Sequence, residues 1–184
     1  MRADFSRKRV ILFDAGGVLV YPNWSEVADI VRERTGRSLA VADLHDAENH
    51  AMNALEGGAV LPDQDRWTVF MSAVLRRAGL DGYPSLDGLV FTLKDVHNSV
   101  SLWTRVAPDA RATLSRLAGY RLGVVSNANG VLKRKLQRLD LLGCFDVVLD
   151  SHEEGVEKPN PEIFRRALER LGADARSEEH TSEL

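Results

Sequence analysis

The chain has 184 residues, of which 44% are hydrophobic, and a formal net charge of −3, which suits one α/β domain with an insertion. It contains no block rich in Lys and Arg that would indicate nucleic-acid binding, no apolar run long enough to span a bilayer, and one cysteine, which excludes an internal disulfide. These features favour a cytoplasmic protein that binds neither nucleic acid nor a membrane.

The first apolar run, Val10–Phe13, ends at Asp14 and is followed closely by two glycines. A short continuous apolar run with a turn at its end is typical of a buried strand in a parallel sheet. From Trp24 to Trp103 the apolar residues recur at helical spacing and form four separate stripes, which predict four amphipathic helices. Ser85 is the expected N-cap of the fourth helix.

After Pro108 the chain alternates between strand and helix patterns. Strands are expected at Leu122–Val125 and Phe145–Leu149, and helices over residues 130–139 and 161–171. One strand, a helical excursion and renewed strand–helix–strand units predict an α/β fold, a doubly wound parallel sheet with an inserted helical cap.

We expect the core that carries the sheet to consist of residues 1–20 and 105–175, and the helical cap to span residues 21–104. The final segment, residues 176–184, matches the translation of a common sequencing adapter residue for residue. We therefore expect this tail to be non-native and the natural domain to continue beyond residue 175.

Polar residues follow each of the three predicted strands. Asp14 follows the first strand, Ser126 and Asn127 follow the second, and Lys158 lies beyond the third. Each of them alone has a structural explanation, because Asp, Ser and Asn are ordinary turn residues. The carboxyl ends of parallel strands meet at one edge of a sheet, however, so we expect these side chains to line one pocket.

Three segments resemble motifs of the haloacid dehalogenase superfamily of hydrolases. Residues 13–19 (FDAGGVL) resemble motif I, residues 124–127 (VVSN) resemble motif II, and residues 155–164 (GVEKPNPEIF) resemble motif III. Their order, spacing and strand context agree with this family from residue 10 to residue 175. The form of motif I is similar to that of the phosphatase-like domains related to the N-terminal half of soluble epoxide hydrolases.

The resemblance implies a phosphomonoesterase that acts on a small phosphorylated metabolite. Asp14 would attack phosphorus and form an aspartyl-phosphate, and Ser126 would hydrogen-bond a phosphoryl oxygen. Lys158 would neutralise negative charge on the nucleophile and on the transferring group. Asn127 and Gly17 would bind the substrate, the glycine by permitting close approach of the backbone to the phosphate.

The resemblance also implies a Mg²⁺ cofactor bound by the Asp14 carboxylate and the Gly16 carbonyl, since this cation prefers oxygen ligands. Gly16 stands where phosphatases of the family usually carry a second Asp as general acid and base, whose loss removes ~10²–10⁴-fold in rate unless another group replaces it. The acidic motif IV would follow Gly172 and is absent. We therefore expect residues 1–175 alone to be inactive and, with Val10–Phe13 left as a bare sheet edge, to aggregate.

Two alternatives remain open. A 2-haloacid dehalogenase also uses an aspartate nucleophile, but it usually has Tyr followed by Gly-Thr where this chain has Gly16-Gly17-Val18. A domain that only binds phosphate or a protein partner would also explain Gly16. A dinucleotide-binding domain is disfavoured because no Gly-x-Gly-x-x-Gly follows the first strand. The sequence predicts no oligomeric state.

Other polar residues are interpreted as structural. Residues 152–154 are expected to form a solvated turn, and Cys144 is expected to be buried as a small hydrophobic residue. We expect no metal ligand among the cap histidines. Four cap residues could line the entrance to the site: Trp24, His45, His50 and His97.

Overall fold

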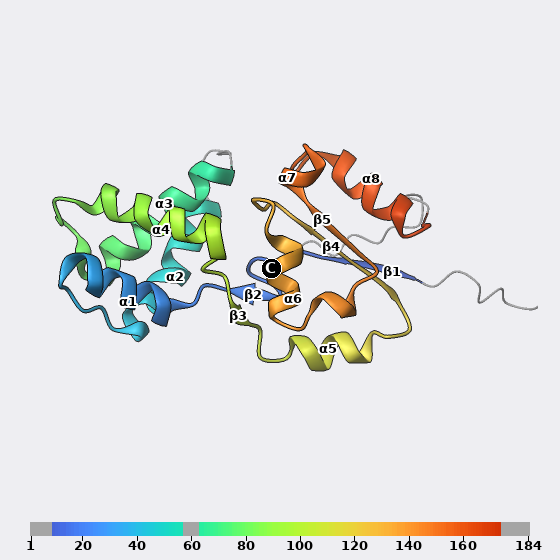
Figure 1. Cartoon of the computed structure of the whole chain (residues 1–184), viewed down its shortest axis with the longest axis horizontal. Coiled ribbons are helices and arrows are strands. Elements are labelled where there is room, and N and C mark those ends of the chain that lie inside the picture. The colour runs from blue at the N-terminus through green and yellow to red at the C-terminus, as the bar shows by residue number, and fades with distance from the viewer. Residues whose placement is uncertain (1–8, 57–62, 174–184) are drawn as a thin grey trace, which may run out of the picture. The chain divides into compact units, whose positions relative to one another are not determined.

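The computed structural model describes residues 9–56 and 63–173 (Figure 1). The chain forms two compact units, one made of Met1–Tyr21 and Thr104–Leu184 and the other of Pro22–Trp103. In the described part of the chain, every helix is too short or too polar to cross a membrane. The adapter-like tail, residues 176–184, lies outside the described residues.

A parallel sheet of three strands forms the centre of the first unit, in the order β1 (Val10–Phe13), β4 (Arg121–Ser126) and β5 (Val147–Asp150). The register pairs Phe13 with Val124 and Ser126 with Asp150. The three strands therefore end near one another at the same edge of the sheet. The predicted α/β class with a parallel sheet is confirmed.

Helices lie on both sides of this sheet (Figure 1). α8 (Pro161–Arg170) packs through its apolar face against Val125 and Leu149. α6 (Leu132–Arg138) also packs on β5 and lies on the other side of the strands. Side chains alternate between the faces of a strand, so both faces of the central strands are covered. The remaining helices of this unit are α5 (Ala110–Arg116), the 3₁₀ turn η2 (Leu142–Cys144) and α7 (Ser151–Glu154).

A small antiparallel ribbon joins β2 (Val20–Tyr21) to β3 (Arg105–Val106). The guanidinium of Arg105 lies 4.9 Å from the centre of the Tyr21 ring, a cation–π contact. The sequence did not predict this ribbon, because a strand of two residues is too short to show a period of two. The ribbon lies where the chain leaves the first unit and where it returns.

Two further expectations for the first unit are wrong. Cys144 is exposed, because it ends a 3₁₀ turn before the strand and does not lie inside it. The strand β5 starts at Val147 and not at Phe145, since the Asp146 carboxylate accepts a hydrogen bond from the Leu122 N–H at 2.9 Å. The Asp146 N–H also donates to the Leu122 carbonyl at 2.8 Å, so Asp146 engages both backbone groups of Leu122 just before the strand begins.

The second unit is helical, and its four predicted helices are confirmed. These helices are α1 (Trp24–Thr35), α2 (Val41–Glu56), α3 (Asp63–Leu75) and α4 (Leu86–Val100). A π-helical turn, η1 (Arg76–Leu80), directly follows α3 and precedes α4 in the chain. Ser85 precedes α4 as predicted, but its side chain makes no capping hydrogen bond. Instead, its carbonyl accepts the N–H of Leu89 at 3.0 Å.

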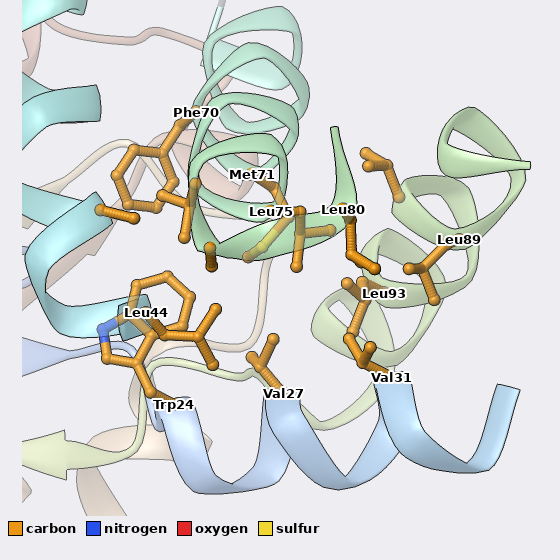
Figure 2. Packing of buried hydrophobic residues seen from close by; sticks show 14 of the residues in the cluster. Trp24, Val27, Val31, Leu44, Phe70, Met71, Leu75, Leu80, Leu89 and Leu93 are labelled. Atoms are coloured by element: carbon orange, nitrogen blue, oxygen red, sulfur yellow. The ribbon is translucent and has the colours of Figure 1, made fainter. Parts of the chain in front are cut away.

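The helices of this unit enclose a continuous apolar core (Figure 2). Trp24 is 1% exposed and lies beside Leu44 and Val27 in this core. Its indole N–H donates to the Glu48 carboxylate at 2.7 Å. The expectation that Trp24 lines an entrance is wrong, because its position on the apolar stripe of α1 turns the ring into the core.

Glu154 lies at the end of α7, where the sequence predicted a solvated turn. Its carboxylate accepts hydrogen bonds from both Nη atoms of Arg170, at 2.6 and 2.9 Å, and from Arg166 at 3.4 Å. These bonds, those from Arg170 above all, lower the pKa of Glu154 below its usual 4.5. Glu154 therefore ties α7 to α8, so the interpretation as a solvated turn is wrong for this residue, whereas His152 and Glu153 are exposed as expected.

Replacement Glu154→Gln is expected to lower the free energy of unfolding by about 1 kcal/mol at pH 7, as for a network of partly exposed ion pairs. A carboxyl with a lowered folded pKa stabilises the protein above pH 4.5, and this contribution is lost as the pH falls through the folded value. Urea unfolding at pH 7 and at pH 3 should show the difference shrinking in acid. Glu157→Gln, at an exposed position with no side-chain hydrogen bond among the described residues, is the control.

Candidate active site

Asp14 and Lys158 are in contact at the carboxyl edge of the sheet. Asp14 directly follows β1, and Lys158 lies in the loop between α7 and α8. The Lys158 Nζ is 2.6 Å from the Asp14 Oδ2, and the side chains are 21% and 40% exposed, respectively. A carboxylate that remains accessible beside a fixed cation can meet an anionic substrate, because the ammonium offsets the repulsion between the two anions.

A tight turn follows Asp14. The Ala15 N–H donates to the Asp14 Oδ1 at 2.6 Å, and the Ala15 carbonyl accepts the N–H groups of Leu19 and Val20 at 2.9 Å. Gly17 has a φ of +78°, a conformation that favours glycine, and its N–H donates to the Val20 carbonyl at 2.9 Å. The Gly17 N–H is therefore not available to a substrate. The predicted role of Gly17, close approach of the backbone to the phosphate, depends instead on the absence of a side chain.

Ser126 ends β4, two residues beyond Val124, which pairs with the last residue of β1, Phe13, and Ser126 is 5% exposed. No described residue makes a hydrogen bond with its hydroxyl group. A serine hydroxyl can donate one hydrogen bond and accept two, so this group retains its capacity to bind an oxygen of a ligand. The structure thus brings Asp14, Ser126 and Lys158 to one edge of the sheet.

The side chain of Asn127 is directed to the loop that carries Lys158. Its Nδ2 donates to the Lys158 carbonyl at 3.0 Å, and its Oδ1 accepts the Lys158 N–H at 2.7 Å. Both ends of the amide are therefore engaged by one backbone residue. The sequence predicted Asn127 as a substrate-binding residue and contained no signal for this pairing.

Asp150 and Ser151 fix the loop that follows Asn127. The buried carboxylate of Asp150 accepts hydrogen bonds at 2.9 to 3.2 Å from three backbone N–H groups, those of Gly130, Leu132 and His152. The Ser151 Oγ accepts the N–H of Ala128 at 3.1 Å and donates to its carbonyl at 3.2 Å. Sequence reasoning missed both residues, although Asp150 ends an apolar run just as Asp14 does.

A family model described as haloacid dehalogenase-like hydrolase matches residues 8–179 of the chain. The chain belongs to this hydrolase family. The glyceraldehyde 3-phosphate phosphatase of Pyrococcus furiosus is 31% identical over 170 residues, 88% of this chain and 67% of that protein. The enzyme of the same name from Pyrococcus abyssi is 42% identical over 82 residues, 43% of this chain and 34% of that protein. The matches span between about a third and two thirds of these relatives' lengths.

A solved structure shares the fold of this haloacid dehalogenase-like hydrolase. It is that of the HAD hydrolase YfnB from Bacillus subtilis bound to magnesium, with a TM-score of 0.59 and 19% identity, and the match covers 89% of this chain and 72% of that one. The likeness shows a Rossmann-like core with a helical cap, as predicted. The family resemblance is confirmed, and the roles of the individual motif residues stay predictions.

A second cation of the hydrolase lies near Asp14. Lys135, on α6, is half-buried, and this burial lowers the pKa of Lys135 from its usual 10.5, while the negative charges of Asp150 and Asp14 raise it. The pattern of α6 predicted only an amphipathic helix, so Lys135 was missed. This edge of the sheet therefore carries two lysines, Lys135 and Lys158, and two carboxylates, those of Asp14 and Asp150.

The described residues offer few ligands for a metal ion. No cluster of three or more His, Cys, Asp or Glu side chains occurs among them. Asp14 supplies one carboxylate, and the Gly16 carbonyl accepts no hydrogen bond from another described residue. Mg²⁺ is commonly held by one or two carboxylates while waters and substrate phosphates complete its shell, so these two oxygen donors fit that cation when a phosphate is bound.

Proposed function

We propose that this hydrolase is a Mg²⁺-dependent phosphomonoesterase that uses Asp14 as its nucleophile. The observation that carries the proposal is the contact of Asp14 with Lys158 at the edge where the parallel strands end. The two Pyrococcus relatives are named as phosphatases of a small phosphorylated metabolite, which supports a substrate of this class. The activity of the whole protein is part of this proposal.

In the first step, a carboxylate oxygen of Asp14 attacks phosphorus, and the bond from phosphorus to the ester oxygen breaks. Lys158 neutralises negative charge on the phosphoryl oxygens while the phosphoryl group moves from the leaving group to the nucleophile. The Ser126 hydroxyl donates to one of these oxygens. Water then attacks phosphorus in the aspartyl-phosphate, releases phosphate and restores the Asp14 carboxylate. When bound, Mg²⁺ would reduce the repulsion between the Asp14 carboxylate and the phosphate of the substrate.

The leaving alcohol needs a proton, and the position of the usual second Asp is occupied by Gly16. Water is the donor in our proposal, because no side chain exists at this position. General acid catalysis is worth ~10²–10⁴-fold, and substrates with good leaving groups depend on it least. We therefore expect aryl phosphates to be turned over faster than alkyl phosphates.

The test is release of phosphate from p-nitrophenyl phosphate, with Mg²⁺ and after chelation by EDTA. It is made on the 184-residue chain and on a version extended to the full length of the Pyrococcus relatives, of which the matched parts are 34% and 67%. We expect Mg²⁺-dependent turnover by the latter and none by the former, because the described residues supply a single carboxylate to the metal site.

Two other results would contradict the proposal. Halide release from 2-chloropropionate without metal, and no phosphate release, would identify a dehalogenase. Binding of inorganic phosphate without turnover of either substrate would identify a domain that only binds phosphate.

A further inference from the structure

We propose that Asn127 is a positioning residue, which clamps the backbone of Lys158 and thereby sets the Lys158 ammonium against Asp14. The proposal deepens the proposed function and rests on it for the catalytic use of Lys158. It assigns the Asn127 side chain to this clamp instead of to the substrate.

The clamp is a pair of hydrogen bonds in opposite directions. The Asn127 Nδ2 donates to the Lys158 carbonyl at 3.0 Å, and the Lys158 N–H donates to the Asn127 Oδ1 at 2.7 Å. Two hydrogen bonds to one planar amide fix both the position and the orientation of the Lys158 backbone relative to Asn127. These two bonds hold the loop backbone much as the backbone hydrogen bonds of a neighbouring strand would.

A lysine side chain needs such a support. It has four rotatable bonds and loses much rotamer entropy when its ammonium is held in one place. In the loop between α7 and α8, residues 155–160, the Asn160 N–H donates to the Glu157 carbonyl and the Asn160 carbonyl accepts the N–H of Ile163 in α8, and neither bond reaches the sheet. Val156 packs on the cluster that contains Val125 and Leu149, and the Asn127 clamp adds hydrogen bonds from the end of β4 to Lys158 itself.

Asn127 is itself attached to the most constrained part of the sheet. It follows β4, the central strand, which is hydrogen-bonded to β1 on one side and β5 on the other. Asp14 follows β1, and Asp150 and Ser151 fix the residues after Asn127. Nucleophile and clamp thus share one frame, so the 2.6 Å contact between Asp14 and Lys158 depends on where Asn127 holds the loop.

The experiment measures the rate at which the Lys158 amine is acetylated, by peptide mass spectrometry, in the 184-residue chain. An ammonium held against a carboxylate reacts slowly, and loss of the clamp releases it. We expect Asn127→Ala to raise the labelling rate of Lys158 about fivefold, the loss that one to two net hydrogen bonds produce. Asp14→Asn, which removes the ion-pair partner, should raise it at least as much.

Controls separate this result from a loss of structure. Asn160→Ala removes the N-cap of α8 in the same loop, where Oδ1 accepts the Glu162 N–H at 3.0 Å, and should leave the labelling of Lys158 unchanged. The half-buried Lys135 reports unfolding of the unit in the Asn127 variants. Lys133, whose 2.7 Å ion pair with Glu153 is kept in every variant, serves as the reference.

If Asn127→Ala unfolds the unit, Asn127→Asp replaces it, because this variant keeps the acceptor and the size and loses the donor to the Lys158 carbonyl. A rise of about twofold is then expected. An unchanged Lys158 rate in a folded Asn127 variant, with a raised rate in Asp14→Asn, would overturn the clamp. Labelling needs no turnover, so the clamp is tested in the 184-residue chain whether or not that chain is active. Absence of Mg²⁺-dependent turnover by the extended version would refute the phosphatase and leave the clamp standing.

Discussion

Replacement Asp14→Asn is expected to lower the Mg²⁺-dependent hydrolysis of p-nitrophenyl phosphate by at least about 10⁴-fold in the extended version of the chain. The amide is nearly the same size as the carboxylate but cannot attack phosphorus, and it cannot pair with the Lys158 ammonium, whose Nζ is 2.6 Å from the Asp14 Oδ2. The measurement is kcat and KM with a constant excess of Mg²⁺, because the substitution also removes a proposed metal ligand.

Asp109→Asn is the matched control for this prediction. Asp109 precedes α5 in the same unit, is exposed, and makes no side-chain capping hydrogen bond. Its substitution removes the same charge at a residue that makes no hydrogen bond or ion pair with Asp14, Ser126 or Lys158, and it should change kcat/KM less than about twofold. Retention of more than a tenth of the activity by Asp14→Asn would show that another residue is the nucleophile.

Replacement Trp24→Ala is expected to destabilise the helical unit by about 3–5 kcal/mol. The ring is 1% exposed and lies beside Leu44 in the core of Figure 2, so its loss leaves a cavity among close-packed side chains. The substitution also deprives the Glu48 carboxylate of the indole N–H that it accepts at 2.7 Å. Urea unfolding followed by circular dichroism at 222 nm measures the effect.

Two variants resolve the sources of this loss. Trp24→Phe keeps most of the apolar volume and removes the bond to Glu48, so it should cost about 1–3 kcal/mol. Phe91→Ala removes an aromatic ring of α4 that is 65% exposed and should cost less than about 0.5 kcal/mol. Equal costs for Trp24→Ala and Phe91→Ala would contradict the assignment of Trp24 to the core.

The order of the main elements could be predicted because its signals are local. Four apolar residues before Asp14 predict a buried strand, and apolar stripes at helical spacing predict the helices between Trp24 and Trp103. The ends of the elements were less certain, since single hydrogen bonds decide them. The bond between Asp146 and Leu122, for example, moves the start of β5.

The candidate site was predicted as a set of residue types and not as a set of contacts. Sequence order placed Asp14, Ser126 and Lys158 after three strands, and the rule that parallel strands end at one edge brought them together. Their catalytic roles stay predictions. The sequence did not show that Lys135 is half-buried near Asp14, because burial depends on how α6 lies on the sheet.

By itself, the sequence determined the α/β fold class, the family and the residues at the strand ends, since each follows from local pattern or from motifs. Only the tertiary structure decided which polar groups serve each other. Asn127 and Lys158 are 31 residues apart, and Glu154 and Arg170 are 16 apart, so no periodicity relates them. Such pairs form where folding brings distant parts of the chain together, and the part-buried amide of Asn127 must then find hydrogen-bond partners among the groups placed beside it.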